Sequence, residues 1–164
     1  MKRYAWLWMV LVLMLVAVGS GCSKKAVGSA SATPEGGYNE NEDAARTLEE
    51  SKRVIVLEKI YFAFNSSDLT PQGREILTRK AEIIREKPSL KVIIEGNCDE
   101  RGTHEYNLAL GERRAQSAYT YLVNLGINPS QLETISYGKE RPADPGHGEA
   151  AWALNRRDEF RLVW

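Results

Sequence analysis

The chain has few residues of the kind that build covalent or metal-held structure. Its 164 residues include only two cysteines, Cys22 and Cys98, and two histidines, His104 and His147. No spacing of these residues matches a zinc signature. Two distant cysteines also give no disulfide framework, although small exported domains often depend on one. The fold is therefore expected to depend on a hydrophobic core, and we expect no metal and no cofactor.

An excess of charge of one sign is also lacking. Lysine and arginine together number 22, and aspartate and glutamate together number 22. Nucleic-acid-binding domains usually carry a clear basic excess on one face. The sequence therefore argues against nucleic acid as a partner.

Long apolar runs are absent except at the start of the chain. Residues 5–18 form an unbroken apolar run of fourteen residues behind Lys2 and Arg3. A membrane-spanning helix needs about 20 such residues, whereas a positive start followed by a shorter run is typical of a secretory signal. We therefore expect residues 1–21 to be a signal peptide.

The end of this signal resembles the lipobox of bacterial lipoproteins. Small residues at 19–21 lead directly to Cys22. In that class the cysteine receives a lipid and becomes the new amino terminus, although Gly19 departs from the leucine that the class prefers. Lipidation at Cys22 is the expectation, and ordinary signal cleavage with Cys22 as a bystander is the alternative.

Composition divides the remainder of the chain in two. Residues 22–50 are rich in serine, alanine, glycine and acidic side chains, which predicts a flexible tether, with a weak helical tendency over 46–53. Residues 51–164 carry the periodic patterns of a folded domain. Strands are predicted at 54–57, 60–64, 91–95, 133–137 and 160–164. Helices are predicted from Thr70 to Pro88, from Thr103 to Gly126, and over 149–155.

This order of elements predicts the fold class. Strands alternate with helices in the order β-α-β-α-β-short α-β, which favours an α/β two-layer sandwich with helices packed on a mixed sheet. Residues 96–102 then form a loop at the carboxyl end of a buried strand, where α/β folds commonly bind ligands.

This loop and the following helix carry a dense group of charges. Helical side chains lean toward the amino terminus, so Arg114 is expected to reach back toward the loop that carries Asp99. The two residues could form a salt bridge that fixes the loop. They could also bind a zwitterion, with Asp99 taking an ammonium and Arg114 a carboxylate. Spacing alone does not choose between these alternatives.

Several separated motifs resemble the OmpA-like domain family, and within it the peptidoglycan-associated lipoproteins. The motifs are DERGT at 99–103, EYN at 105–107, LGERRA at 110–115, SYGKE at 136–140 and NRR at 155–157. The resemblance covers about residues 54–164. It implies non-covalent binding of the meso-diaminopimelate residue of peptidoglycan, without catalysis. Carried over by position, it assigns binding to Asp99, Arg114, Asn107, Leu110, Asn65 and Phe64.

The resemblance also implies partners and a location. These are the outer membrane, reached through lipid at Cys22, peptidoglycan in the periplasm, and TolB with the Tol complex, which would compete with the cell wall. The chain departs from the usual pattern at Ala63, Asn97, Cys98 and His104. Arg101 is expected to be a surface or loop-bracing residue, with contact to the ligand as the alternative. Arg156 and Arg157 are expected along the sheet edge.

Two rival functions use the same residues. Cys98 with His104 or His147 could form a thiol nucleophile and its base, yet Cys98 lies beside Asp99, which does not favour a thiolate. An OmpA-like domain could also anchor a different envelope complex to the cell wall. The signal and the tether favour the lipoprotein.

Overall fold

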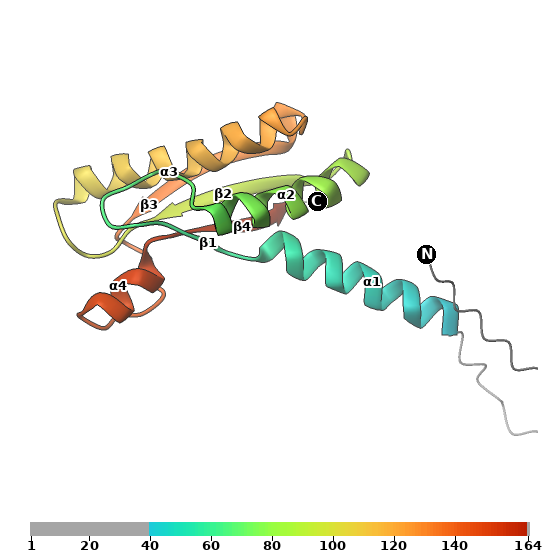
Figure 1. Cartoon of the computed structure of the whole chain (residues 1–164), viewed down its shortest axis with the longest axis horizontal. Helices are drawn as coiled ribbons and strands as arrows, with labels where there is room; N and C mark the ends of the chain where they lie inside the picture. Colours follow the sequence, from blue (N-terminus) through green and yellow to red (C-terminus); the bar gives the residue numbers. More distant parts are fainter. Residues whose placement is uncertain (1–39, 164) are drawn as a thin grey trace, which may run out of the picture. The chain divides into compact units, whose positions relative to one another are not determined.

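The computed structural model describes residues 40–163 (Figure 1). The predicted signal peptide, Cys22 and the first part of the predicted tether lie outside these residues. Within residues 40–163, no helix is both long enough and apolar enough to cross a membrane.

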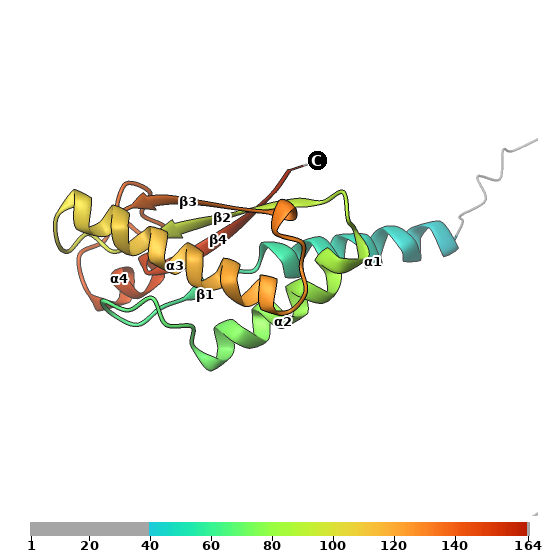
Figure 2. The same cartoon turned by 90° about the horizontal axis from the view of Figure 1, so that it is seen from above.

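Residues 40–163 form four helices, a short 3₁₀ helix and four strands. The strands form one sheet in the order β1-β4-β2-β3, in which β2 and β3 are parallel and β4 is antiparallel to both β1 and β2. Helices α2 and α3 lie over one face of this sheet (Figures 1 and 2). The predicted α/β fold with a mixed sheet is confirmed. The elements are α1 (Glu40–Leu57), β1 (Ile60–Tyr61), α2 (Pro71–Glu86), β2 (Lys91–Asn97), α3 (His104–Asn124), η1 (Pro129–Gln131), β3 (Leu132–Gly138), α4 (Glu149–Asn155) and β4 (Arg157–Val163).

Helices α2 and α3 begin and end where the sequence predicts. The Thr70 hydroxyl accepts a hydrogen bond from the amide of Gly73 at 3.0 Å, and the Thr103 hydroxyl accepts one from the amide of Tyr106 at 3.1 Å. Both satisfy amides that the first turn of a helix leaves unpaired. At the end of α3, Gly126 adopts a φ of +88°. The Ile127 amide then donates to the carbonyl of Leu122 at 3.1 Å, as in a Schellman motif.

The hydrophobic core lies between the helices and the sheet. Its helical members include Leu77 and Ile84 of α2 and Ala118 and Leu122 of α3, which are fully buried. Leu108 of α3, although apolar, is 36% exposed. In the first half of α3 the buried stripe passes through other residues, Asn107, Leu110, Gly111 and Arg114, and this part of the helix faces a polar site.

Two glycines let α3 lie directly on β2. A Cβ atom added to Gly96 would lie 2.0 Å from the carbonyl oxygen of Gly111, and one added to Gly111 would lie 2.9 Å from the carbonyl oxygen of Gly96. Only glycine permits such a close approach of two backbones. This contact fixes the height of α3 above the sheet and therefore the position of Arg114, one turn further along the helix.

The amino-terminal part of the domain differs from the prediction. Residues 54–57 were expected to form a strand, and residues 40–50 were assigned to the flexible tether, yet both belong to helix α1. The β-branched run at 54–56 favours a strand by intrinsic preference, but packing overrides this preference. Val56 is 1% exposed within the core, and the ammonium of Lys80 bonds the carbonyl of Val56 at 2.6 Å.

Strands β1 and β4 also differ from their predicted limits. β1 ends at Tyr61 rather than at residue 64, because the chain turns away after Phe62, whose amide donates to the carbonyl of Arg156 at 2.9 Å. β4 begins at Arg157 rather than at residue 160 and lies between β1 and β2. The expectation that Arg156 and Arg157 lie along a sheet edge is therefore wrong, and both are buried.

Candidate binding site

A cavity of about 200 Å³ lies beyond the carboxyl end of β2, between the loop after β1 and the first half of α3. The six residues assigned to binding from the sequence all line it, although their role in binding stays a prediction. Arg101 and Tyr106 also line it. From the sequence, ligand contact was only the alternative for Arg101, and Tyr106 was not assigned to binding. The six are Phe64, Asn65, Asp99, Asn107, Leu110 and Arg114.

The first wall of the cavity is the loop after β1. Asn65 occupies the left-handed region with a φ of +52°, which asparagine tolerates better than most residues. Its side-chain carbonyl accepts a hydrogen bond from the hydroxyl of Tyr106 on α3. This bond ties the loop to the helix across the cavity. Phe64 is 59% exposed and places an aromatic ring at the mouth.

Asn107 braces the opposite loop. Its side-chain amide donates to the carbonyl of Arg101 at 2.8 Å and to that of Thr103 at 3.0 Å. Asn107 is only 2% exposed. Because both of its donors are directed at the backbone, Asn107 shapes the cavity through the loop.

Arg114 forms the floor of the cavity and is completely buried. Its Nε donates to the carbonyl of Ser66 at 2.8 Å, its Nη1 to the carbonyl of Asn97 at 2.8 Å, and its Nη2 to the carbonyl of Ala63 at 3.2 Å. Burial lowers the pKa of Arg114, but arginine keeps its charge at neutral pH. One guanidinium thus joins the loop after β1 to the end of β2.

A second carboxyl group lies in the interior near Arg114. Asp158 of β4 is fully buried, and neither of its side-chain oxygens has a hydrogen-bond partner among residues 40–163. Burial raises the pKa of Asp158 well above its ordinary value, against the opposing effect of the charge on Arg114. Burial therefore favours the neutral form of the Asp158 carboxyl.

Asp99 pairs with two other arginines. Its Oδ2 accepts from Nη2 of Arg101 at 2.6 Å and from Nη1 of Arg156 at 3.5 Å. Burial acts to raise the pKa of the Asp99 carboxyl, but hydrogen bonds and charge from Arg101 outweigh burial, so this pKa lies below its ordinary value. Within the described part of the chain, no ion pair joins Asp99 to Arg114. Of the two alternatives left open, the direct salt bridge is not the one observed.

Arg101, expected as a surface or loop-bracing residue, is central to the site. Its guanidinium lies 3.9 Å from the ring centre of Phe64 and 4.1 Å from that of Trp152 on α4. The indole nitrogen of Trp152 in turn donates to Glu100 at 2.9 Å. The spacing of Asp99 and Arg101 gave a signal for this pair, since an aspartate can accept from the amide two residues on. Nothing in the local sequence pointed to Trp152.

The residues of the proposed thiol enzyme are not brought together. The Cys98 thiol donates to the carbonyl of Asn107 at 3.3 Å, and burial raises its pKa to about 11, so it is not a thiolate at neutral pH. His104 contacts Glu140 and His147 contacts Glu100, each at 2.9 Å. Among residues 40–163, no group of three or more histidine, cysteine or acidic side chains is placed to hold a metal ion.

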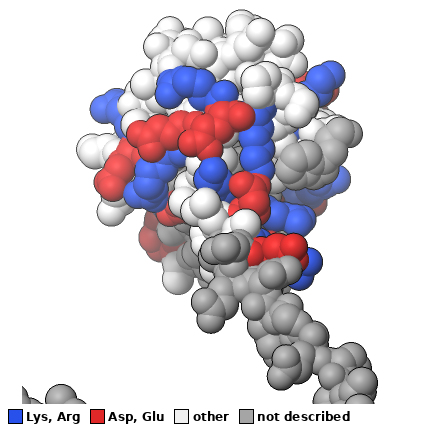
Figure 3. All heavy atoms as spheres, turned by 90° about the vertical axis from the view of Figure 1, so that its right-hand side faces the viewer, with Lys and Arg blue, Asp and Glu red and all other residues white. Residues whose placement is uncertain are grey.

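Charge at one end of the domain is mixed. Figure 3 shows this end, where the charged part of the surface has lysine and arginine side chains among aspartate and glutamate side chains. This face offers no continuous basic patch of the kind that binds nucleic acid.

Comparison with known proteins agrees with the fold and the motifs. The model of the OmpA family matches residues 61–156. Peptidoglycan-associated lipoproteins of Pseudomonas putida and Pseudomonas aeruginosa are 44% and 43% identical to the chain over 146 and 149 residues. These alignments cover 86% of this chain in each case and 87% and 88% of the relatives.

Solved structures agree as well. The crystal structure of the peptidoglycan-associated lipoprotein from Burkholderia pseudomallei is 42% identical with a TM-score of 0.63, over 64% of this chain and 89% of that one. The carboxy-terminal domain of Helicobacter pylori MotB has a TM-score of 0.62 at 24% identity, over 65% and 84% of the two chains, and shows the fold alone. The chain is not an enzyme. The chain belongs to the OmpA family and, within it, to the peptidoglycan-associated lipoproteins.

Proposed function

We propose that this lipoprotein links the outer membrane to the cell wall by non-covalent binding of the meso-diaminopimelate residue of a peptidoglycan stem peptide. The observation that carries the proposal is the placement of one carboxylate, Asp99, and one guanidinium, Arg114, on the same cavity of about 200 Å³. The end of the diaminopimelate side chain carries an ammonium and a carboxylate on one carbon. The cavity offers a complementary charge for each of these groups.

The donors of Arg114 suit a single ligand carboxylate oxygen. Four of its five N–H groups are directed at the carbonyls of Ser66, Asn97 and Ala63 and at the sulfur of Cys98. The remaining Nη2 N–H has no hydrogen-bond acceptor among residues 40–163, and it is the donor that we assign to the ligand. The backbone contacts hold the guanidinium in place, so binding costs little side-chain entropy.

The remaining walls of the cavity limit the access of water to the two charged groups. Leu110 is 5% exposed, and Phe64 closes the mouth of the cavity beside Asn65. A charge-assisted hydrogen bond contributes more when water is excluded, about 1.5–3 kcal/mol compared with 0–1 kcal/mol for an exposed pair. Binding strength should therefore depend on these apolar walls as well as on the two charges.

The wider role follows from the family. Lipid at Cys22 would hold one end of the chain in the outer membrane, and the domain would bind the wall in the periplasm. We propose TolB and the Tol complex as protein partners, in the maintenance of the envelope and in cell division. TolB would bind over the same cavity and release the domain from the wall.

The proposal is tested with intact cell walls. The full-length protein in detergent should sediment with peptidoglycan that contains diaminopimelate and should stay in solution with peptidoglycan that contains lysine at the same position. Purified TolB should release the bound protein in proportion to its concentration. Equal sedimentation with both walls would contradict diaminopimelate recognition. Failure of TolB to compete would favour the alternative, an anchor for another envelope complex.

A further inference from the structure

We infer that the Arg101 guanidinium occupies the Asp99 carboxylate in the free protein and is displaced by the ammonium of the ligand. We call the Arg101 side chain in this position the plug. The inference rests on the function proposed above and concerns how the site becomes able to bind. It assigns to Arg101 a role in selecting ligands that carry a positive charge.

The first observation is that the Asp99 carboxylate has no vacant acceptor position. A carboxylate offers about four lone-pair positions. Oδ1 of Asp99 accepts from the backbone amide of Arg101 at 3.1 Å and from its Nε at 3.2 Å. Oδ2 accepts from Nη2 of Arg101 at 2.6 Å and from Nη1 of Arg156 at 3.5 Å. An incoming ammonium can therefore bond Asp99 only if one of these donors leaves.

The second observation identifies which donor can leave. The side chain of Arg156 is 7% exposed and is held by the carbonyl of Phe62 at 3.2 Å and by Glu149 at 2.7 Å. The side chain of Arg101 is 30% exposed, and its two side-chain hydrogen bonds within residues 40–163 both go to Asp99. Moving Arg101 therefore breaks one ion pair at the cavity mouth, whereas moving Arg156 would disrupt buried contacts.

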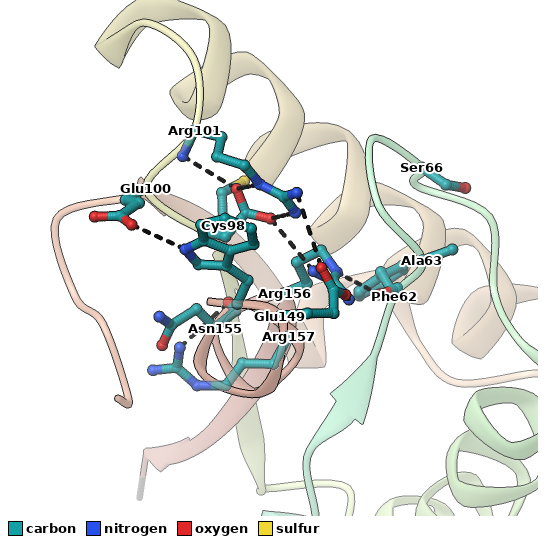
Figure 4. Close-up of polar contacts among 12 residues, drawn as sticks. Phe62, Ala63, Ser66, Cys98, Glu100, Arg101, Glu149, Asn155, Arg156 and Arg157 are labelled. Atoms are coloured by element: carbon teal, nitrogen blue, oxygen red, sulfur yellow. Dashed lines mark hydrogen bonds and ion pairs between the residues drawn. The ribbon is translucent and has the colours of Figure 1, made fainter. Parts of the chain in front are cut away.

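The third observation is a second carboxylate beside the plug. Oε2 of Glu149, a residue whose side chain is 65% exposed, lies 3.8 Å from Nη1 of Arg101. Figure 4 shows Glu149 beside Arg156 below the Arg101 guanidinium. Because the guanidinium is stacked between the rings of Phe64 and Trp152, it can move from Asp99 toward Glu149 and keep its aromatic contacts. The Arg101 guanidinium thus has a closed position on Asp99 and an open position beside Glu149.

The plug has a consequence for specificity. The closed position lowers the apparent affinity of every ligand that needs Asp99, by the fraction of molecules that are open. A ligand with an ammonium offsets part of this loss because it replaces the positive charge of Arg101 on Asp99. A ligand with a neutral group in the same place does not, since it would leave the buried carboxylate with only the 3.5 Å contact to Arg156 as a charged partner.

The test is a calorimetric titration of the full-length protein in detergent with a diaminopimelate stem peptide. Arg101→Met removes the side-chain donors to Asp99 and keeps an apolar side chain between the two rings. We expect it to bind the peptide about tenfold more tightly than the unchanged protein, which corresponds to about 1.4 kcal/mol. Arg74→Met, at an exposed arginine of α2, is the matched control and should bind as the unchanged protein does.

Each other outcome has a defined meaning. Equal or weaker binding by Arg101→Met, while the unchanged protein binds, would overturn the plug and leave the proposed function standing. Absence of binding by the unchanged protein would overturn the proposed function itself. If Arg101→Met does not fold, proton exchange in the unchanged protein tests the plug instead. Solvent exchange of the Arg101 Nε proton should become faster at saturating peptide, and unchanged or slower exchange would overturn the plug.

Discussion

The ammonium of Lys80 on α2 lies 2.6 Å from the carbonyl oxygen of Val56 in the last turn of α1, and Lys80 is completely buried. It also donates to the carbonyls of Ile55 and Glu58 and lies 3.9 Å from the ring centre of Phe160. Three ammonium protons thus match three carbonyl oxygens where α1 ends. The contact joins α1, which connects the domain to the amino-terminal part of the chain, to the core.

Replacement of Lys80 by methionine should therefore weaken the domain. The change leaves buried carbonyls without donors, and we expect a loss of about 2–3 kcal/mol in the free energy of unfolding. Burial lowers the pKa of Lys80 to about 7, so urea unfolding is best measured at pH 6, where the ammonium form prevails. Lys91→Met, at an exposed position of β2, is the control and should change stability little. Equal stability of the two variants would contradict the capping role of Lys80.

The close contact between α3 and β2 predicts a large effect of one methyl group. Gly96→Ala would place a Cβ atom 2.0 Å from the carbonyl oxygen of Gly111. Since backbone must move to relieve this overlap, we expect a loss of about 3 kcal/mol in the free energy of unfolding by urea. Gly126→Ala is the matched comparison, because no atom lies within 4 Å of its added Cβ but its φ is +88°. This second change should cost about 1 kcal/mol through backbone strain alone.

The contact between His147 and Glu100 predicts a pH dependence. A hydrogen bond and the charge of Glu100 raise the pKa of His147 above its ordinary value of 6.5. A histidine with a raised pKa stabilises the folded protein below pH 6.5, and this contribution is lost as the pH rises through the folded value. Nuclear magnetic resonance titration of the imidazole should give a midpoint above 6.5. Glu100→Gln should move the midpoint back toward 6.5, and an unchanged midpoint would remove Glu100 as the cause.

The buried carboxylate of Asp99 predicts the opposite dependence. Its pKa lies below the ordinary value of 3.8, so its stabilising effect is present above pH 3.8 and is lost as the pH falls through the folded value. Asp99→Asn should therefore unfold at lower urea concentration than the unchanged protein at pH 7. The difference should shrink as the pH is lowered below 3.8. A difference that is the same at both pH values would show that the charge of Asp99 is not responsible.

Much of the fold could be predicted because local signals and packing agree there. Thr70, Thr103 and Gly126 mark helix ends through hydrogen bonds within a few residues of the chain. The strand at 54–57 was predicted wrongly because the branched side chains favour a strand, whereas Lys80, 24 residues away from Val56, holds them in a helix. A contact at that separation leaves no local pattern in the sequence.

In the candidate site, too, some features could be predicted from the sequence and others depend on contacts between distant residues. The resemblance to the family assigned Asp99 and Arg114 to one binding site, and both residues line the same cavity. The partners of Asp99 were not predicted, because Arg156 reaches it from 57 residues away and Trp152 stacks on Arg101 from α4. Arg156 is buried because β4 lies between β1 and β2. The order of strands in a sheet cannot be predicted from a local sequence pattern.

The measurement that tests the account most directly compares two stem peptides that differ at one position. The full-length protein is titrated calorimetrically with the diaminopimelate peptide and with its lysine analogue, which keeps the amine and lacks the distal carboxylate. The account predicts binding of the diaminopimelate peptide, much weaker binding of the lysine peptide, and loss of this difference in Arg114→Lys with the fold retained by circular dichroism. Equal affinity of the unchanged protein for both peptides would contradict it, because Arg114 would then have no ligand carboxylate to recognise.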